Sequence, residues 1–302
     1  MFPFVVLLTI CGVLVPDAAH AWGGGIHLQA GLSVLSALDT LPPAIGAVLG
    51  AYPRDYLYGC IAADIIVGKK YTHYLLNCHR WRIGQKVLQA ARSDGEKACA
   101  YGYLSHLAAD GIAHNYFVPY KIMRSFASVT MKHTYWEMRF ETFADKAVWE
   151  RAREICRSDQ HANDAMLRSV LTNTLFSFGT NKRIFNSIML LSRLEKWQKV
   201  MRTLSDNSRY TLAESDRDEY MTLTEEAVFD FLRHPEESEC LTTDPTGEKA
   251  LAAADALRKN LRLLYKNGRI SKADGLEQVD LLKHKLRQAL HKPELLKELH
   301  RG

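Results

Sequence analysis

The most concentrated chemistry in the sequence lies in the segment His106-Leu-Ala-Ala-Asp110-Gly-Ile-Ala-His114. Two imidazoles and a carboxylate recur every four residues, so a helix of about 3.6 residues per turn places all three on one face. Imidazole and carboxylate groups are zinc ligands. A solvated polar stripe is the alternative interpretation. The flanking residues are largely apolar, however, and burial of unpaired histidine and aspartate is costly, which favours a metal.

A second pair with the same spacing follows at His133 and Glu137, in aromatic surroundings. On a helix these side chains also share a face. Taken alone, the pair is equally compatible with a side-chain hydrogen bond or a partly exposed ion pair. Its occurrence shortly after the first cluster favours a shared metal-binding function.

Further candidate ligands lie upstream, at Asp64, His73 and His79. Asp64 follows an apolar stretch, where an aspartate can instead cap the next helix. His73 is equally compatible with a packed or surface histidine. These residues support a metal site only in combination with the two downstream clusters.

Residues 1–21 have the pattern of a signal peptide. An apolar run from Phe4 to Val15 precedes Pro16, and Ala19-His20-Ala21 is a small-x-small cleavage site. The segment before the run carries no Lys or Arg, and an uncleaved anchor is the alternative. We predict export, to the periplasm or the exterior, with cleavage after Ala21.

Cleavage at that position would create the N-terminus Trp22-Gly-Gly-Gly-Ile-His27. The α-amino nitrogen and carbonyl oxygen of one residue can close a five-membered chelate ring on a metal ion. An α-amino group, whose ordinary pKa is about 7.7–8.0, loses its proton readily to zinc. The glycines allow the chain to fold back on a buried ion. A mobile terminus is the plainer interpretation.

Helical periodicity dominates the rest of the chain and predicts an all-α, multi-helical domain. No alternating run bounded by turn signals indicates a sheet. The expected helical segments are Leu28–Leu38, Arg82–Ala91, Cys99–Asn115, His133–Arg157, Asn163–Phe178, Arg183–Met201 and Thr222–Arg233.

A polar break at residues 236–246 indicates a domain boundary. Beyond it, Leu251–Tyr265 and Ala273–Leu290 flank the turn residues Asn267-Gly268 and predict a helical hairpin with a short helical tail. We therefore expect a signal peptide at 1–21, a catalytic domain at 22–240 and a hairpin appendage at 241–302. The hairpin would pack on the body or on a second subunit.

Composition sets only broad limits. The 302 residues are 47% hydrophobic and carry a formal charge of +5, which suits a folded domain with a sizeable core. A mildly basic surface is compatible with anionic membranes or nucleic acid and does not distinguish them. The cysteine spacings contain no CxxC pair and identify no disulfide framework.

In these motifs the chain resembles the zinc-dependent phospholipase C proteins and the related single-strand-specific zinc nucleases. Both begin their mature form with a tryptophan whose amino and carbonyl groups bind zinc. His79 is preferred to His73 because its separation from Asp64 suits the family, whereas His114 follows Asp110 more closely than expected. The matching positions, in chain order, are Trp22, His27, Asp64, His79, His106, Asp110, His114, His133 and Glu137.

The resemblance implies three zinc ions. The first would be bound by Asp64, His79, His106 and Asp110, the second by the main chain of Trp22, by His27 and by the other oxygen of Asp110, and the third by His114, His133 and Glu137. A carboxylate can bridge ions about 3.5–4 Å apart, and paired zincs activate water to attack phosphorus. Asp64 is the candidate to orient that water, and Asp110 the bridging carboxylate.

Two substrates fit this chemistry. Cleavage of a phospholipid at a membrane surface would need an apolar rim, for which Tyr52, Tyr56, Tyr58, Phe117 and Tyr120 are candidates. Cleavage of single-stranded nucleic acid would need stacking aromatics and a basic groove. Lys69, Lys70, Lys121 and Arg124 are candidates for that groove. The aliphatic helices favour the phospholipase, and a non-catalytic zinc-binding secreted protein is a third possibility.

Overall fold

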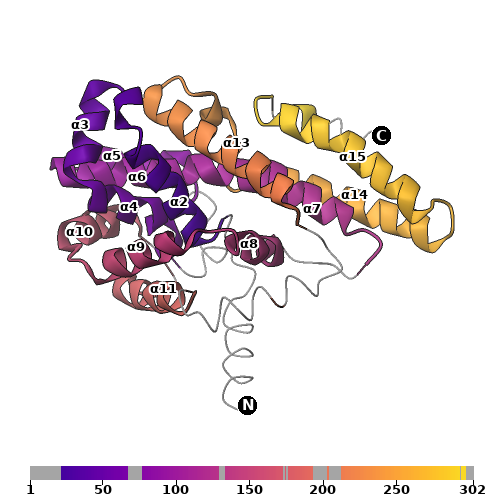
Figure 1. Ribbon diagram of the computed structural model, residues 1–302, viewed down its shortest axis with the longest axis horizontal. Coiled ribbons are helices and arrows are strands. Elements are labelled where there is room, and N and C mark those ends of the chain that lie inside the picture. The colour runs from indigo at the N-terminus through magenta and orange to yellow at the C-terminus, as the bar shows by residue number, and fades with distance from the viewer. Residues whose placement is uncertain are drawn as a thin grey trace, which may run out of the picture.

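The computed structural model describes residues 22–66, 77–128, 133–172, 174, 176–192, 203, 212–292 and 294–296 (Figure 1). The expected signal peptide, His73 and most of the expected C-terminal tail lie outside these ranges. Within them the regular secondary structure is helical, with no strand, which confirms the all-α prediction. No helix in these ranges is both long and apolar enough to cross a membrane.

One long rod organises the molecule (Figure 1). It consists of α6 (Asp94–Ile112), a π-helical turn η5 (Ala113–Phe117) and α7 (Val118–Arg124). Ser93 starts α6 with a capping box, because its side chain accepts from the Glu96 amide while the Glu96 side chain accepts from the Ser93 amide. Pro119 has no amide hydrogen, which breaks the regular hydrogen-bond ladder near the wider π turn.

Helix α4 (Pro53–Ala62) crosses α6 at very short range. The crossing depends on Gly59 and Gly102, because a Cβ on Gly59 would lie 2.0 Å from the Cys99 carbonyl oxygen. A Cβ on Gly102 would lie equally close to the Tyr56 carbonyl oxygen. Asp64 lies in the short helix η2 (Ala63–Ile65) that continues α4. The crossing therefore holds Asp64 beside the helix that carries His106 and Asp110.

The other body helices are α2 (Gly24–Leu35), α3 (Pro43–Ala51), α5 (Trp81–Ala90), α8 (His133–Glu141), α9 (Lys146–Arg157), α10 (His161–Val170), α11 (Phe178–Ser192) and α13 (Glu214–Arg233), with the 3-10 turns η1 (Leu38–Thr40) and η6 (Glu239–Thr242). Most of these helices pack on α4 or α6, while α8 packs on α2 and α7, and α11 packs on α9 (Figure 1). Together they bury a core that contains Trp22, Tyr103 and Phe117.

Two of the expected helices are shorter in the structure. The segment 133–157 divides into α8 and α9, because the chain leaves the helix at residues 142–145. The Thr142 hydroxyl and amide both bond to the Arg139 carbonyl, which favours a turn over a continuing helix. Likewise α10 ends at Val170, and the expected end of that helix, Phe178, instead begins α11.

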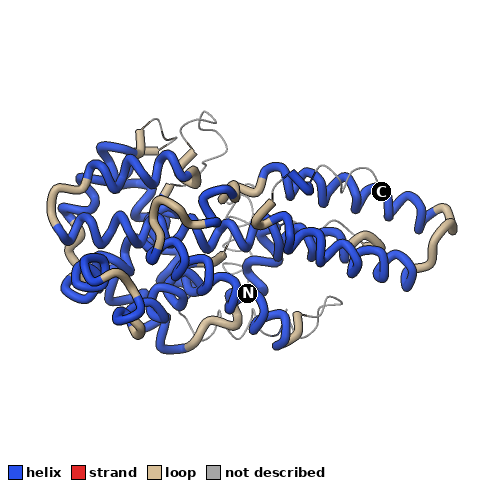
Figure 2. The backbone as a smooth tube through the Cα atoms, turned by 90° about the horizontal axis from the view of Figure 1, so that it is seen from above, coloured by secondary structure: helices blue, strands red, loops and turns tan. Residues whose placement is uncertain are grey.

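The predicted C-terminal hairpin is present, as α14 (Glu248–Lys266) and α15 (Lys272–Ala289). It lies along α7, at the end of the rod that points away from α3 and α10 (Figures 1 and 2). Polar contacts join it to the rod. Arg258 is buried and donates to the Ser128 carbonyl at 3.0 Å, while the Tyr120 hydroxyl donates to Asp280 at 2.7 Å.

Candidate metal centre

The carboxylate of Asp110 lies at the centre of the candidate site, with none of its surface exposed. Its Oδ1 atom is 3.2 Å from His27 Nε2. Its Oδ2 atom is 3.3 Å from both His79 Nε2 and His106 Nε2. The two oxygens thus face different histidines, as a carboxylate that bridges two ions must.

Two groups of buried side chains could each hold a metal ion. The first consists of His27, His106 and Asp110, and the second of Asp64, His79 and His106. In each group the candidate ligand atoms lie within 4.8 Å of one another. The Nε2 atom of His79 is also 3.2 Å from Asp64 Oδ1. Both groups combine imidazole with carboxylate, which suits zinc.

His106 is oriented by the carbonyl of Cys60 in α4, which lies 2.9 Å from His106 Nδ1. A carbonyl only accepts, so Nδ1 carries the proton, and Nε2 points to Asp110. The ring of His27, from α2, stacks on His106 with ring centres 3.7 Å apart. Three segments distant in sequence therefore converge on one carboxylate.

Burial and charge set the protonation states around Asp110. Burial lowers the pKa of His27, and neighbouring His106 lowers it further, which keeps the ring in its neutral form. For Asp110, burial alone would raise the pKa, but the histidines, His106 foremost, outweigh it and hold the pKa well below its usual range. Burial would lower the pKa of His106, but the carboxylates of Asp110 and Asp64 outweigh it and raise that pKa. Metal binding at His106 would therefore release a proton.

The polar atoms of this cluster are poorly satisfied by the protein itself. Both ring nitrogens of His27 and both carboxylate oxygens of Asp110 are buried, and none makes a well-aligned hydrogen bond. Their 3.2 Å contact is close, but its geometry is wrong for a hydrogen bond. Leaving such groups unsatisfied is costly. A metal ion between them would remove that cost, so these residues fit the ion.

Trp22 is fully buried beside this cluster. Its indole nitrogen donates to the carbonyl of Ala109 at 3.1 Å, and its ring packs against Phe117 and Phe140. The side chain is therefore an anchor. It fixes the residue that would begin the mature chain to the same turn of α6 that carries Asp110.

A third pair lies further along the rod. His114 Nε2 is 3.7 Å from Glu137 Oε1, and both residues are buried. The Nδ1 atom of His114 lies 2.6 Å from the carbonyl oxygen of Pro245. His133 begins α8, but its side chain lies outside the described part of the structure, as does all of His73.

The prediction of an apolar substrate rim was wrong for four of its five aromatic residues. Tyr56, Tyr58, Phe117 and Tyr120 are all buried in the core, and of the five only Tyr52 is exposed. These four lie near the ligands in sequence, but the hydrophobic effect places them inside. Of the expected basic groove, Lys69 and Lys70 lie outside the described residues.

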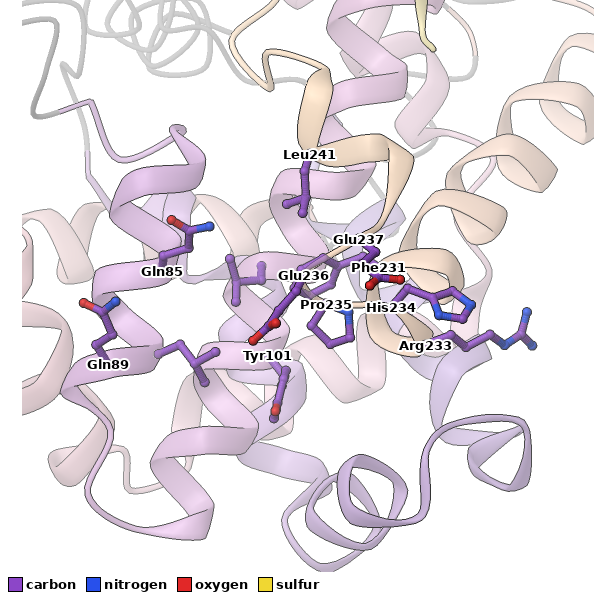
Figure 3. A pocket seen from close by; sticks show the side chains of 12 residues that line it. Gln85, Gln89, Tyr101, Phe231, Arg233, His234, Pro235, Glu236, Glu237 and Leu241 are labelled. Atoms are coloured by element: carbon purple, nitrogen blue, oxygen red, sulfur yellow. The ribbon is translucent and has the colours of Figure 1, made fainter.

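A cavity of about 710 Å³ lies elsewhere in the molecule, between α5, α6 and the end of α13 (Figure 3). It is lined by residues such as Gln85, Tyr101, Phe231 and His234. None of the candidate metal ligands lines it. The cavity and the candidate metal centre are therefore separate features.

Sequence reasoning missed Glu141, which lies one helical turn after Glu137. Its carboxylate accepts a hydrogen bond from the Gly25 amide at 2.6 Å and another from the Ile26 amide at 3.4 Å. Glu141 thereby caps the N-terminus of α2, two residues before His27. Burial raises its pKa to about 7. The signal was available, because His133, Glu137 and Glu141 repeat the four-residue spacing of the first cluster.

These observations define a class of protein, one with an all-helical fold and a buried histidine–aspartate cluster. Comparison with known protein families matches residues 26–176 to the zinc-dependent phospholipase C family. That match covers half of the chain, and the protein belongs to this family. The matched segment includes every candidate side-chain ligand and begins after Trp22. No curated protein and no solved structure matches the chain significantly.

The cap that Glu141 supplies can be tested by substitution. We expect Glu141→Ala to lower the free energy of unfolding by about 1–3 kcal/mol, because the Gly25 amide loses its acceptor. Glu141→Gln keeps an acceptor oxygen and should cost clearly less. Glu150→Ala removes an exposed glutamate from α9 and is the matched control. Urea denaturation measures all three, and equal stability of the two alanine variants would contradict the assignment.

Proposed function

We propose that this protein is an exported, zinc-dependent phosphodiester hydrolase that cleaves phospholipid headgroups in the manner of a phospholipase C. The observation that carries the proposal is the placement of Asp110, whose two oxygens face different buried histidines. Membership of the zinc-dependent phospholipase C family supports the choice of metal and of reaction.

The proposed ligands form three sets. Asp64, His79 and His106 would share one ion with Asp110 Oδ2, and His27 would share a second with Asp110 Oδ1 and the main chain of Trp22. The third ion would take His114, Glu137 and His133. The distances among the described side chains support the first two sets most directly.

When bound, zinc would supply Lewis-acid activation of a water nucleophile and of the phosphoryl group. The protein's own groups have separate tasks. Asp110, kept ionised by its histidines, balances the positive charge of the site. Asp64 lies at the edge of the second group, 3.2 Å from His79, and is the carboxylate proposed to orient the water. Its short helix continues from the rigid α4 crossing, which fixes its position.

One observation weakens the nucleic-acid alternative. Lys121, expected in a basic groove, is buried and pairs with Asp216 at 2.8 Å. Arg124 pairs with Asp280 at 3.2 Å. The buried Lys121 is therefore not available to contact a phosphate backbone, whereas the pair of Arg124 with Asp280 is partly exposed. Contacts with phosphates are the main source of affinity for nucleic acid.

Export is part of the proposal and rests on the signal-peptide pattern of residues 1–21. The α-amino group of Trp22 exists only after cleavage behind Ala21, so removal of residues 1–21 would complete the metal centre. After that cut, the buried Trp22 side chain would hold the new N-terminus beside the cluster.

The central test is hydrolysis by the mature, zinc-loaded protein. We expect release of phosphocholine from phosphatidylcholine micelles, and little cleavage of single-stranded DNA. Asp110→Asn keeps the shape of the side chain but removes its charge, and should lower both zinc content and activity, the activity by more than about 100-fold. Asp159→Asn alters an exposed aspartate of the same chain and should change neither.

The other outcomes are equally informative. Cleavage of DNA but not of lipid would assign the protein to the nuclease branch. Bound zinc without hydrolysis of either substrate would make it a non-catalytic zinc protein and contradict the proposal.

The role of the N-terminus gives a separate prediction. The exported protein should start at Trp22 on N-terminal sequencing. A version that begins with Gly-Ser before Trp22 should bind about one zinc ion fewer, because its amino group is displaced from the site. Metal analysis of the two forms measures this, and equal zinc contents would remove Trp22 from the ligand set.

A further inference from the structure

We propose that the segment Thr243–Gly247 is a positioning element of the metal centre, acting through His114. The C-terminal hairpin begins directly after this segment, at Glu248. The inference rests on the proposed function, because it concerns how one of the proposed zinc ligands is held. It lies outside the part of the chain that matches the family, which ends at residue 176.

The main contact is the hydrogen bond between His114 Nδ1 and the Pro245 carbonyl oxygen, at 2.6 Å. A carbonyl only accepts, so Nδ1 donates and carries the proton. The other nitrogen, Nε2, then keeps its lone pair and faces Glu137 at 3.7 Å. A metal-binding histidine is commonly fixed in this way by a backbone carbonyl on its far nitrogen.

Hydrogen bonds to the rod hold the segment Thr243–Gly247 in place. Asn115 donates both to the Gly111 carbonyl at 2.9 Å and to the Asp244 carbonyl at 2.7 Å. The side chain of Asp244 in turn accepts from the amide and hydroxyl of Thr246. The carbonyl of Pro245 is therefore aimed by bonds on both sides of it.

The same segment is fixed from the hairpin side through Thr243. The Thr243 hydroxyl donates to the Leu290 carbonyl, at the end of α15, at 2.6 Å. The Thr243 carbonyl accepts from the indole of Trp81 at 2.8 Å. The hairpin, through Leu290, and the body, through Trp81, therefore both contact the segment that contains the Pro245 carbonyl.

Gly247 makes the contact with His114 very close. Its φ angle is +60°, in the left-handed region that favours glycine. A Cβ at this position would lie 2.4 Å from the Cβ of His114 and 2.5 Å from its carbonyl oxygen. Any larger residue at position 247 must push His114 or the segment away.

The hairpin contains its own control at Gly268. This glycine also has a left-handed φ, +67°, but a Cβ there would meet nothing within 4 Å. Alanine at either position incurs a similar backbone strain. Only alanine at position 247 also displaces the proposed ligand.

The experiment compares Gly247→Ala with Gly268→Ala in the mature full-length chain. We expect both to lower Tm, while only Gly247→Ala weakens one class of zinc sites by about 10–100-fold and lowers kcat for phosphatidylcholine. Zinc titration with a competing chelator gives the affinities. Equal zinc affinity and kcat in the two variants would overturn the inference.

A second pair covers the case in which Gly247→Ala does not fold. Thr243→Val removes the hydroxyl that bonds to Leu290 while keeping the side-chain shape. Thr242→Val makes the same change at an exposed neighbour. Weaker binding of one zinc in Thr243→Val alone supports the inference, and no difference overturns it. Absence of zinc or activity in the unaltered protein would instead mark failure of the proposed function.

Discussion

The structure depends on the burial of one charged carboxylate, Asp110, in an interior that excludes water. Removing a carboxylate from water is expensive unless opposite charge or hydrogen bonds replace the hydration. Here three histidine rings approach it within 3.3 Å and hold its pKa down. The glycine crossing of α4 with α6, and the indole anchor of Trp22 on Ala109, both bring compensating groups to this point.

Two of the candidate ligands, His106 and His114, are held by carbonyl groups from remote parts of the chain. The Cys60 carbonyl fixes the proton of His106, and the Pro245 carbonyl does the same for His114. In each case the far nitrogen donates, and the near nitrogen faces the other candidate ligands. Helix α4 therefore orients His106, and the segment before the C-terminal hairpin orients His114 in the same way.

Much of the fold and part of the site could be predicted from the sequence. Four-residue spacing is a local property of the sequence. It was therefore enough to predict the all-α class and the helix face that His106 and Asp110 share. The buried positions of Tyr56 and Phe117 depend on which face packs inward, and the rim prediction was wrong there. The contact of His114 with the Pro245 carbonyl could not be predicted from the sequence. Every residue has a backbone carbonyl, and any carbonyl outside a regular helix could accept this hydrogen bond.

The most direct test is a crystal structure of the mature protein with anomalous scattering measured at the zinc absorption edge. We predict two peaks near Asp110, one beside each carboxylate oxygen, and a third beside His114 and Glu137. A single peak that contacts only one oxygen of Asp110, or peaks remote from this carboxylate, would contradict it.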